Sequence, residues 1–202
     1  MRGGPVHSEW EQNMPQQPLI VGIGGSPGPH SMTSRLLVDA LARTADMGAR
    51  TELFRADDLA DLPIYTVHRD VHHPHAERLA AAVREADALI VATPGYHGGI
   101  SGLVKNAIDH LELLSRDARP YLDGRAVGAI VTAAGWQAAG TTLVSVRSAV
   151  HALRGWPTPF AVVVNSTEQA PDDERVVGAI DIMAEQLLQF CRWQAAARET
   201  RA

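Results

Sequence analysis

The feature that most constrains the fold of this chain is a regular alternation of short, continuous apolar runs with longer amphipathic segments. Apolar runs of this length, without a polar residue at every second position, are typical of β-strands buried on both faces. A further run, RTELFRA, alternates more weakly, so we expect it nearer an edge of the sheet. The four strongest runs are PLIVGIGG, DALIVATP, RAVGAIVTAA and PFAVVVN.

The segments between these runs carry apolar residues at helical spacing, which predicts five helices. Strands and helices that alternate along a chain predict an α/β fold: a doubly wound, five-stranded parallel sheet with helices on both faces. Ligands bind such sheets at the carboxyl ends of the strands. The helices are expected over residues 31–47 and near residues 79–86, 103–114, 140–153 and 173–193.

The length of 202 residues suits one domain. We expect this domain to span residues 18–195, because residues 1–17 are polar and lack periodicity, and residues 196–202 look similar. Both ends are therefore expected to be flexible. The composition, with 46% hydrophobic and 20% charged residues, is ordinary for a soluble globular protein.

Charge and cysteine content narrow the functional classes. The net charge of −5, with no basic block, argues against a nucleic-acid partner. Cys191 is the only cysteine, which excludes an intrachain disulfide and a cysteine metal cluster. The chain shows no apolar stretch of membrane-spanning length and no signal-peptide core, so we expect no membrane association and a cytoplasmic location.

A loop rich in glycine and hydroxyl groups, GIGGSPGPHSMTSRLL (residues 22–37), joins the first predicted strand to the first predicted helix. A helix N-terminus offers unpaired amides and a partial positive charge to an anion. Ser26, Ser31, Thr33 and Ser34 add hydroxyls that can donate to phosphate oxygens. The loop therefore predicts a phosphate cradle, although an ordinary turn with Ser31 as the helix N-cap fits it as well.

Other motifs fit this loop less well. A dinucleotide fingerprint that starts at Gly22 fails because its third glycine position is Pro27, and no Walker pattern is present. The letters GGSPG match the G-x-S-x-G elbow of hydrolases, with Ser26 as the nucleophile. Such elbows usually follow several strands, whereas only a polar segment and one strand precede Ser26, so we disfavour a hydrolase.

The second informative loop lies within ATPGYHGGISGLVKNAIDHLELL (residues 92–114) and again joins a buried strand to a helix. Its glycines can place bare backbone against a flat ligand. Tyr96 and His97 supply a planar surface and a polar tip. A loop suited to phosphate and a loop suited to a flat ring, on one edge of a sheet, indicate a mononucleotide.

These stretches resemble the NADPH-dependent FMN reductase family of flavodoxin-like flavoproteins, over most of residues 19–165. GGSPGPHSMTSRLL is similar to the family's Gly-Ser, spacer and Ser pattern. DALIVATPGYHGGISGLVKNAIDHL is similar to its strand, Pro-x-Tyr loop and Gly-x-x-Lys-Asn-x-x-Asp helix. The resemblance implies a flavodoxin-like fold and an NAD(P)H-dependent flavin oxidoreductase that uses FMN with NADPH or NADH.

The resemblance also implies which residues bind FMN. Because the redox chemistry belongs to the cofactor, it implies no protein catalytic residue. A third loop, TAAGWQAAGTT (residues 132–142), is expected near the pyrimidine end of the flavin, although Trp136 fits a subunit interface equally well. The implied residues are Ser26, Ser31, Thr33 and Ser34 around the phosphate, Pro94, Gly95, Tyr96 and His97 along the isoalloxazine ring, and Gly135 and Trp136 in the third loop.

The chain departs from the family pattern at two places. Many members carry an arginine in the first loop, where this chain reads PGPH. Many also read Pro-Glu-Tyr-Asn where this chain has Gly95 and His97 in place of the acid and the amide. The first departure bears on phosphate and nicotinamide binding, and the second on the flavin or on substrate preference.

The resemblance implies a homodimer or homotetramer and a small-molecule electron acceptor. The acceptor is either free flavin for a flavin-dependent monooxygenase, or a quinone or azo compound. The alternative is an FMN-binding electron carrier without nicotinamide turnover. A histidine-rich segment, YTVHRDVHHPH (residues 65–75), suggests a transition-metal site, but Asp70 is its only acid and Pro74 interrupts it, so we expect no metal.

Overall fold

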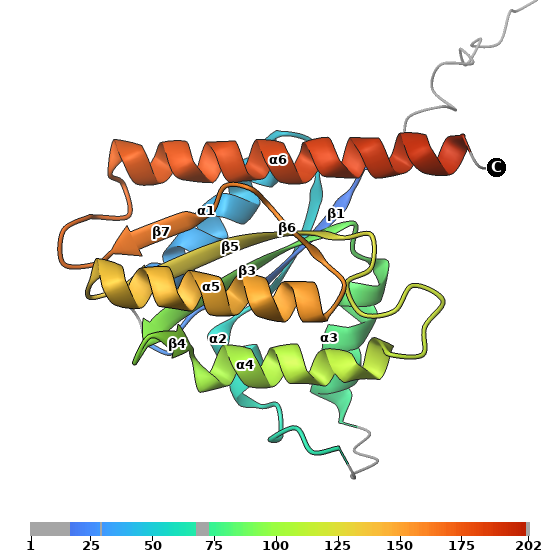
Figure 1. The fold of residues 1–202 in the computed structure, drawn as a ribbon, viewed down its shortest axis with the longest axis horizontal. Coiled ribbons are helices and arrows are strands. Elements are labelled where there is room, and N and C mark those ends of the chain that lie inside the picture. Colours follow the sequence, from blue (N-terminus) through green and yellow to red (C-terminus); the bar gives the residue numbers. More distant parts are fainter. Residues whose placement is uncertain (1–16, 29, 68–72, 201–202) are drawn as a thin grey trace, which may run out of the picture.

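The computed structural model describes residues 17–28, 30–67 and 73–200, and shows a parallel sheet between two layers of helices (Figure 1). The strand order is β2-β1-β3-β5-β6, β7 also pairs with β5, and β4 pairs with β3. This is the flavodoxin-like doubly wound order. The strands are β1 Leu19–Gly24, β2 Arg50–Phe54, β3 Ala88–Tyr96, β4 Gly99–Ile100, β5 Ala126–Ala133, β6 Trp156–Pro157 and β7 Val162–Asn165.

The described part of the sheet has seven strands where the sequence predicts five, and two local features account for the difference. β6 pairs with the start of β5 and β7 with its end, so both occupy the fifth position of the parallel sheet. Between them, Thr158 turns inward: its hydroxyl donates to the Phe160 carbonyl at 2.7 Å. The two-residue β4 runs antiparallel to the end of β3 and closes a hairpin.

The helices cover both faces of the sheet, as predicted. α1 and α6 pack on one face with the core residues Ile20, Ile90 and Leu187, and α3, α4 and α5 pack on the other (Figure 1). None of the helices in the described residues has both the length and the apolarity that a bilayer span requires. The helices are α1 Met32–Asp46, α2 Ala56–Ala60, α3 Pro74–Glu85, α4 Gly102–Asp109, α5 Trp136–Ala152 and α6 Glu174–Glu199, and the 3-10 helix η2 is His110–Leu114.

The helix boundaries differ from the prediction where local sequence is ambiguous. α5 begins at Trp136 rather than near residue 140, because Gly140 is accommodated inside the helix. α6 continues to Glu199, so residues 196–199, expected in a flexible tail, are helical. The alanines before Arg198 favour this extension because alanine has the highest helix propensity. α2 has only five residues, too few for an amphipathic period.

The amino end of the sheet is closed by two arginines. The Arg125 side chain is 1% exposed and donates to the carbonyls of Ala86, Tyr121 and Arg84, at 3.1, 2.9 and 2.7 Å. Arg119 donates to the carbonyls of Asp123 and Gly124 and shares the Ala86 carbonyl with Arg125. Burial lowers the pKa of Arg125 to about 10, with a smaller contribution from the charge of Arg119, so it is still protonated at neutral pH. These guanidinium groups are therefore structural.

Candidate functional site

The loop after β1 is held against β3 by a close backbone contact. Gly24 has φ of 137°, and a Cβ on this residue would lie 1.9 Å from the carbonyl oxygen of Ala92. The next amide, Gly25 N–H, donates to that same oxygen at 3.0 Å. Only glycine fits at position 24, because any other residue would combine a strained backbone with a clash. The contact fixes where the loop turns toward α1.

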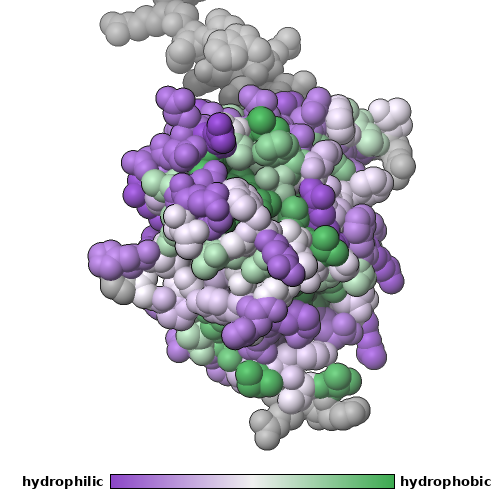
Figure 2. Space-filling view, turned by 60° about the vertical axis from the view of Figure 1, so that its left-hand side comes forward, coloured by the Kyte–Doolittle hydropathy of each residue, from purple (hydrophilic) through white to green (hydrophobic). Residues whose placement is uncertain are grey.

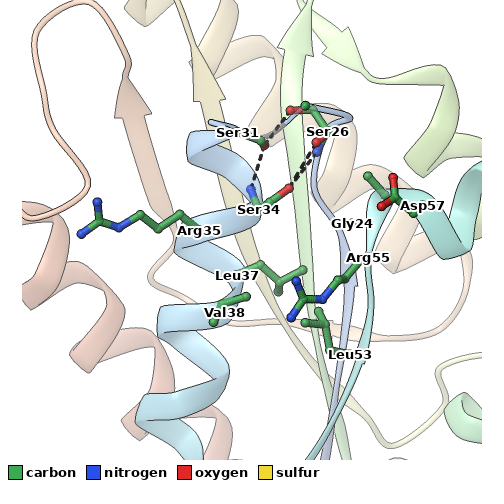
Figure 3. A pocket seen from close by; sticks show the side chains of 12 residues that line it. Gly24, Ser26, Ser31, Ser34, Arg35, Leu37, Val38, Leu53, Arg55 and Asp57 are labelled. Carbon is green, nitrogen blue, oxygen red and sulfur yellow. Dashed lines mark hydrogen bonds between the residues drawn. The ribbon is translucent and has the colours of Figure 1, made fainter.

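Three serine hydroxyls form a bonded cluster at the first turn of α1 (Figure 3). Ser31 is the N-cap, and its Oγ accepts from the Ser34 amide at 3.1 Å, which confirms the predicted cap. The Oγ atoms of Ser26 and Ser31 are 2.7 Å apart, and the Ser34 Oγ donates to the Ser26 carbonyl at 3.2 Å. The amides of Met32 and Thr33 have no carbonyl partner within the helix, an arrangement typical of anion sites.

The second predicted loop is a tight hairpin between β3 and β4. His97 and Gly98 have φ of 52° and 78°, the positive values of a type I′ two-residue turn. Among non-glycine residues, asparagine, aspartate and histidine are enriched in this left-handed conformation. His97 therefore suits this turn position, which also favours the asparagine of the pattern that the loop resembles. The Tyr96 side chain is 57% exposed beside the turn.

Gly95 and Thr142 form a close pair beneath this hairpin. A Cβ on Gly95 would lie 2.8 Å from the Thr142 Oγ1, on α5, and 3.1 Å from the Ala133 Cβ. A glutamate at position 95 would therefore require α5 or the hairpin to shift. The Thr142 Oγ1 is itself buried and has no hydrogen-bond partner in the described residues. Gly95, which stands where many sequences of the pattern have glutamate, is thus packed directly against the Thr142 side chain.

Two cavities flank the loop after β1. The first, the central cavity, has a volume of about 360 Å³ and lies over the ends of β3 and β5. It contains six of the ten residues predicted to bind FMN. Its lining residues are Ser26, Met32, Thr33, Pro94, Gly95, Tyr96, His97, Thr132, Ala133, Ala134 and Ser166.

The second, the side cavity, has a volume of about 560 Å³ and lies between α1 and the segment after β2 (Figure 3). Ser31 and Ser34 line this cavity and not the central one, and Ser26 lines both. Its remaining lining residues are Gly24, Gly28, Arg35, Leu37, Val38, Leu53, Arg55, Ala56 and Asp57.

The remaining predicted residues are distributed around these cavities. Thr33 is 2% exposed, and its Oγ1 lies 2.5 Å from the Thr132 Oγ1, which places it at the base of the central cavity. Gly135 and Trp136 line neither cavity. The Trp136 indole donates to Glu168 at 2.9 Å and ties the third loop to the segment after β7. A flavin-binding role for Gly135 and Trp136 stays a prediction.

The structure adds three residues to the predicted set: Arg55, Thr132 and Ser166. Arg55 and Ser166 directly follow β2 and β7, and Thr132 is the penultimate residue of β5. Thr132 begins the third loop named in the sequence, and the rule that ligands bind at the carboxyl ends of strands, applied to every strand instead of three, would have found Arg55 and Ser166. In Figure 2, this edge is mostly hydrophilic or near-neutral with separate apolar spots, which suits a polar ligand better than a broad apolar partner.

Three other features of the sequence are the histidine-rich segment, Ser26 as a candidate nucleophile and Cys191. His68 and His72 lie outside the described residues; within those residues, no group of three or more His, Cys, Asp and Glu side chains could hold a metal ion. Ser26 Oγ is bonded to a serine, and none of its hydrogen bonds in the described part of the chain involves a histidine, as a hydrolase nucleophile would need. Burial raises the pKa of the Cys191 thiol to about 12, so it is an unreactive core residue.

Curated proteins similar to this chain are flavin enzymes. The chain is 28% identical over 163 residues to the FMN-dependent NADPH-azoreductase of Staphylococcus aureus (strain USA300), a match that covers 77% of this chain and 80% of that protein. It is 33% identical over 93 residues to the FMN reductase (NADPH) of Pseudomonas putida. That second match covers 46% of each protein, so it spans about half the length of the relative.

A solved structure and a family model agree with these relatives. The apo form of an NADH:FMN oxidoreductase superposes with a TM-score of 0.67 and 25% identity, over 85% of this chain and 90% of that one. The model of the NADPH-dependent FMN reductase family matches residues 18–169. The resemblance seen in the two loops is confirmed, and the chain belongs to the NADPH-dependent FMN reductase family.

Proposed function

We propose that the protein is an NAD(P)H-dependent flavin oxidoreductase that holds FMN in the central cavity and reduces a small-molecule acceptor. The observation that carries this proposal is the composition of one cavity: the bare backbone from Pro94 to His97 forms one wall, and the loop of Ser26 and the first turn of α1 form another. A backbone wall against which a flat ring can lie, beside a set of hydroxyls and free amides, suits a flavin with a phosphate tail.

The residues present fit FMN. A volume of about 360 Å³ lies within the range of small-molecule sites. The hydroxyls of Ser26 and Thr33 and the unpaired amides of α1 can receive the phosphate end. Thr132 shares the base of the cavity with Thr33, and Ser166 adds a further hydroxyl to the lining. When bound, FMN accepts hydride from a nicotinamide and passes electrons on.

The chain contributes position rather than reactive groups. The type I′ turn at His97 and Gly98 fixes the hairpin backbone, and the contact between Gly24 and Ala92 fixes the phosphate loop. Both walls are thereby preorganised, which lowers the entropic cost of aligning two rings. The exposed Tyr96 borders the open side of the cavity, where donor and acceptor can bind in turn.

The acceptor class and the assembly belong to the same proposal. The match to the FMN-dependent NADPH-azoreductase of S. aureus covers 77% of this chain and the match to the FMN reductase of P. putida 46%, so we favour FMN as a bound cofactor and an azo compound or a similar acceptor such as a quinone. Free flavin for a partner monooxygenase is the second candidate. We propose that the protein is a homodimer or homotetramer. We also propose a cytoplasmic location, because disulfides are rare in the cytoplasm and a chain with one cysteine forms none within itself.

An anaerobic titration tests the proposal. The FMN-loaded protein is titrated with NADPH and then NADH while the flavin absorbance is followed near ~450 nm, where oxidised flavins absorb. Bleaching supports the reductase. FMN that binds without bleaching would instead indicate an electron carrier, and failure to bind FMN would contradict the assignment of the cavity.

A pair of variants locates the site. Thr33→Val removes a hydroxyl in the central cavity, and we expect FMN affinity to fall about tenfold, as for one lost hydrogen bond to a charged group. Thr44→Val is the matched control: Thr44 is also buried on α1, but its hydroxyl donates to the Leu41 carbonyl at 2.8 Å, outside the cavity. Equal affinities for both variants, measured by fluorescence titration, would contradict the placement.

A further inference from the structure

The side cavity is larger than the central cavity, and the proposed flavin site does not use it. Its floor is apolar, formed by Leu37 and Val38 of α1 and Leu53 of β2. Its rim is polar and carries the hydroxyls of Ser31 and Ser34 (Figure 3). An apolar floor with a polar rim suits a flat ring that bears a hydrophilic, anionic group.

The topology around this cavity is that of a nucleotide-binding β-α-β unit. β1, α1 and β2 follow one another, and β1 and β2 pair in parallel, with Ile23 opposite Phe54. In dinucleotide-binding β-α-β units, whose glycine fingerprint this chain lacks, a residue near the end of the second strand contacts the adenosine ribose. An acidic residue there pairs with the 2′-hydroxyl of NAD, whereas an arginine nearby accommodates the 2′-phosphate of NADP. Here Arg55 directly follows β2.

The charges around Arg55 leave its guanidinium available. Among the described residues, no carboxylate forms an ion pair with it; Asp58 accepts instead from the Arg55 amide at 2.9 Å and from Arg78 at 3.1 Å. In Figure 3, Arg55 reaches between Leu53 and α1, whereas the Asp57 side chain is farther from α1. The guanidinium therefore lies over the apolar floor, apart from the acidic group on the rim.

Arg35, the other cation of the cavity, has a different setting. Its Nε lies 3.7 Å from the Asp39 carboxylate, one helical turn away. Figure 3 shows its side chain directed away from Arg55. The two arginines therefore give a matched comparison: they carry the same charge beside the same cavity, but only Arg55 points over its floor.

We propose that the side cavity binds the adenosine 2′-phosphate of NADPH, and that Arg55 is the residue that selects NADPH over NADH. This assignment rests on the proposed function. Ser26 lines both cavities, so they meet at the loop after β1, and one extended dinucleotide can place its nicotinamide at the central cavity and its adenosine in the side cavity. Arginine suits this role because its planar fork binds phosphate through two parallel hydrogen bonds.

Binding without turnover provides the first test. Adenosine 2′,5′-bisphosphate and adenosine 5′-monophosphate are titrated calorimetrically into the FMN-loaded protein. The wild type is expected to bind the bisphosphate at least about tenfold more tightly, as for charge-assisted hydrogen bonds to one phosphate. Arg55→Gln is expected to abolish the difference, and Arg35→Gln to retain most of it. Equal binding of the two nucleotides by the wild type would overturn the proposal.

Kinetics provide the second test. In Arg55→Gln, KM for NADPH is expected to rise about tenfold with kcat unchanged, because a contact remote from the nicotinamide contributes equally to ground and transition states. KM for NADH is expected to stay the same. An unchanged NADPH-to-NADH ratio would refute the role of Arg55 while leaving the reductase intact. Absence of flavin bleaching with either donor in the wild type would instead refute the proposed function.

Discussion

The two ends of the sheet both carry buried polar groups, but they use them in opposite ways. At the amino end, Arg125 and Arg119 direct their donors at carbonyls of their own chain. At the carboxyl end, serine and threonine hydroxyls bond to one another beside two cavities, and the Thr142 hydroxyl has no partner among the described residues. Polarity alone therefore does not distinguish the two ends of the sheet; they differ in whether the polar groups line a cavity.

The substitution Arg125→Met is expected to have the largest effect. It tests whether the polar groups at the amino end of the sheet stabilise the fold. The substitution removes three hydrogen bonds and leaves the Tyr121 and Arg84 carbonyls without this donor, whereas the Ala86 carbonyl keeps Arg119, so we expect the free energy of unfolding to fall by about 3 kcal/mol. Urea denaturation measures this loss. The folded fraction should bind FMN as the wild type does, since Arg125 lies at the opposite end of the strands from the cavities.

The exposed Arg116 supplies the control for this substitution. Arg116→Met removes the same charge close by in sequence and should change stability by no more than about 0.5 kcal/mol. A similar loss in both variants would mean that net charge, and not the carbonyl contacts of Arg125, stabilises this end.

Ser31→Ala tests the carboxyl end of the sheet. There the Ser31 hydroxyl is expected to affect both the stability of the fold and the binding of FMN. Loss of the N-cap should lower stability by about 1 kcal/mol. Because Ser26 also loses its 2.7 Å partner, FMN affinity should fall about tenfold.

Asp173→Ala removes the N-cap of α6, where the carboxylate accepts from the Arg175 amide at 2.8 Å, outside both cavities. It should show a similar stability loss with unchanged FMN affinity. If both cap variants bound FMN like the wild type, the serine cluster would be a cap alone.

The smallest expected effect comes from Thr142→Val. The substitution replaces an unpaired buried hydroxyl by a methyl group of similar size, so we expect stability to rise by up to about 1 kcal/mol in thermal unfolding. Ser145→Ala on the same helix is the control, because its hydroxyl is exposed and donates to the Thr141 carbonyl at 3.0 Å. Destabilisation by Thr142→Val would mean that the hydroxyl has a partner in solution.

The sequence predicts most of this fold because the signals for its main elements are local. The continuous apolar runs identify the long parallel strands, and Ser31 marks the start of α1 as expected. β6 and α2 were not predicted, since two and five residues are too few to establish a period. The split in the fifth strand depends on how Thr158 turns against the adjacent strand, a contact that no single segment encodes.

The candidate site is predicted only in part, and for a similar reason. Motifs and family resemblance identify the loops after β1 and β3, which lie within continuous stretches of sequence. Ser31 and Ser34 line the side cavity, whereas Thr33 lines the central cavity. Which hydroxyl lies on which side depends on the rotation of α1 against the sheet. The Gly95 and Thr142 pair joins residues 47 positions apart, which no motif links.

The interrupted fifth strand has a consequence for the protein in crowded solution. A strand at the edge of a sheet offers unpaired amides and carbonyls on which another chain can build. At the edge opposite β2, the unpaired backbone is limited to the two residues of β6 and the four of β7. Pro157 and Pro159 lack the amide hydrogen that a docking strand would need, and Thr158 is already bonded to β5 and to Phe160. This edge of the sheet is thus protected against edge-to-edge aggregation, so the proteins that pair through an exposed strand would have to do so through β2.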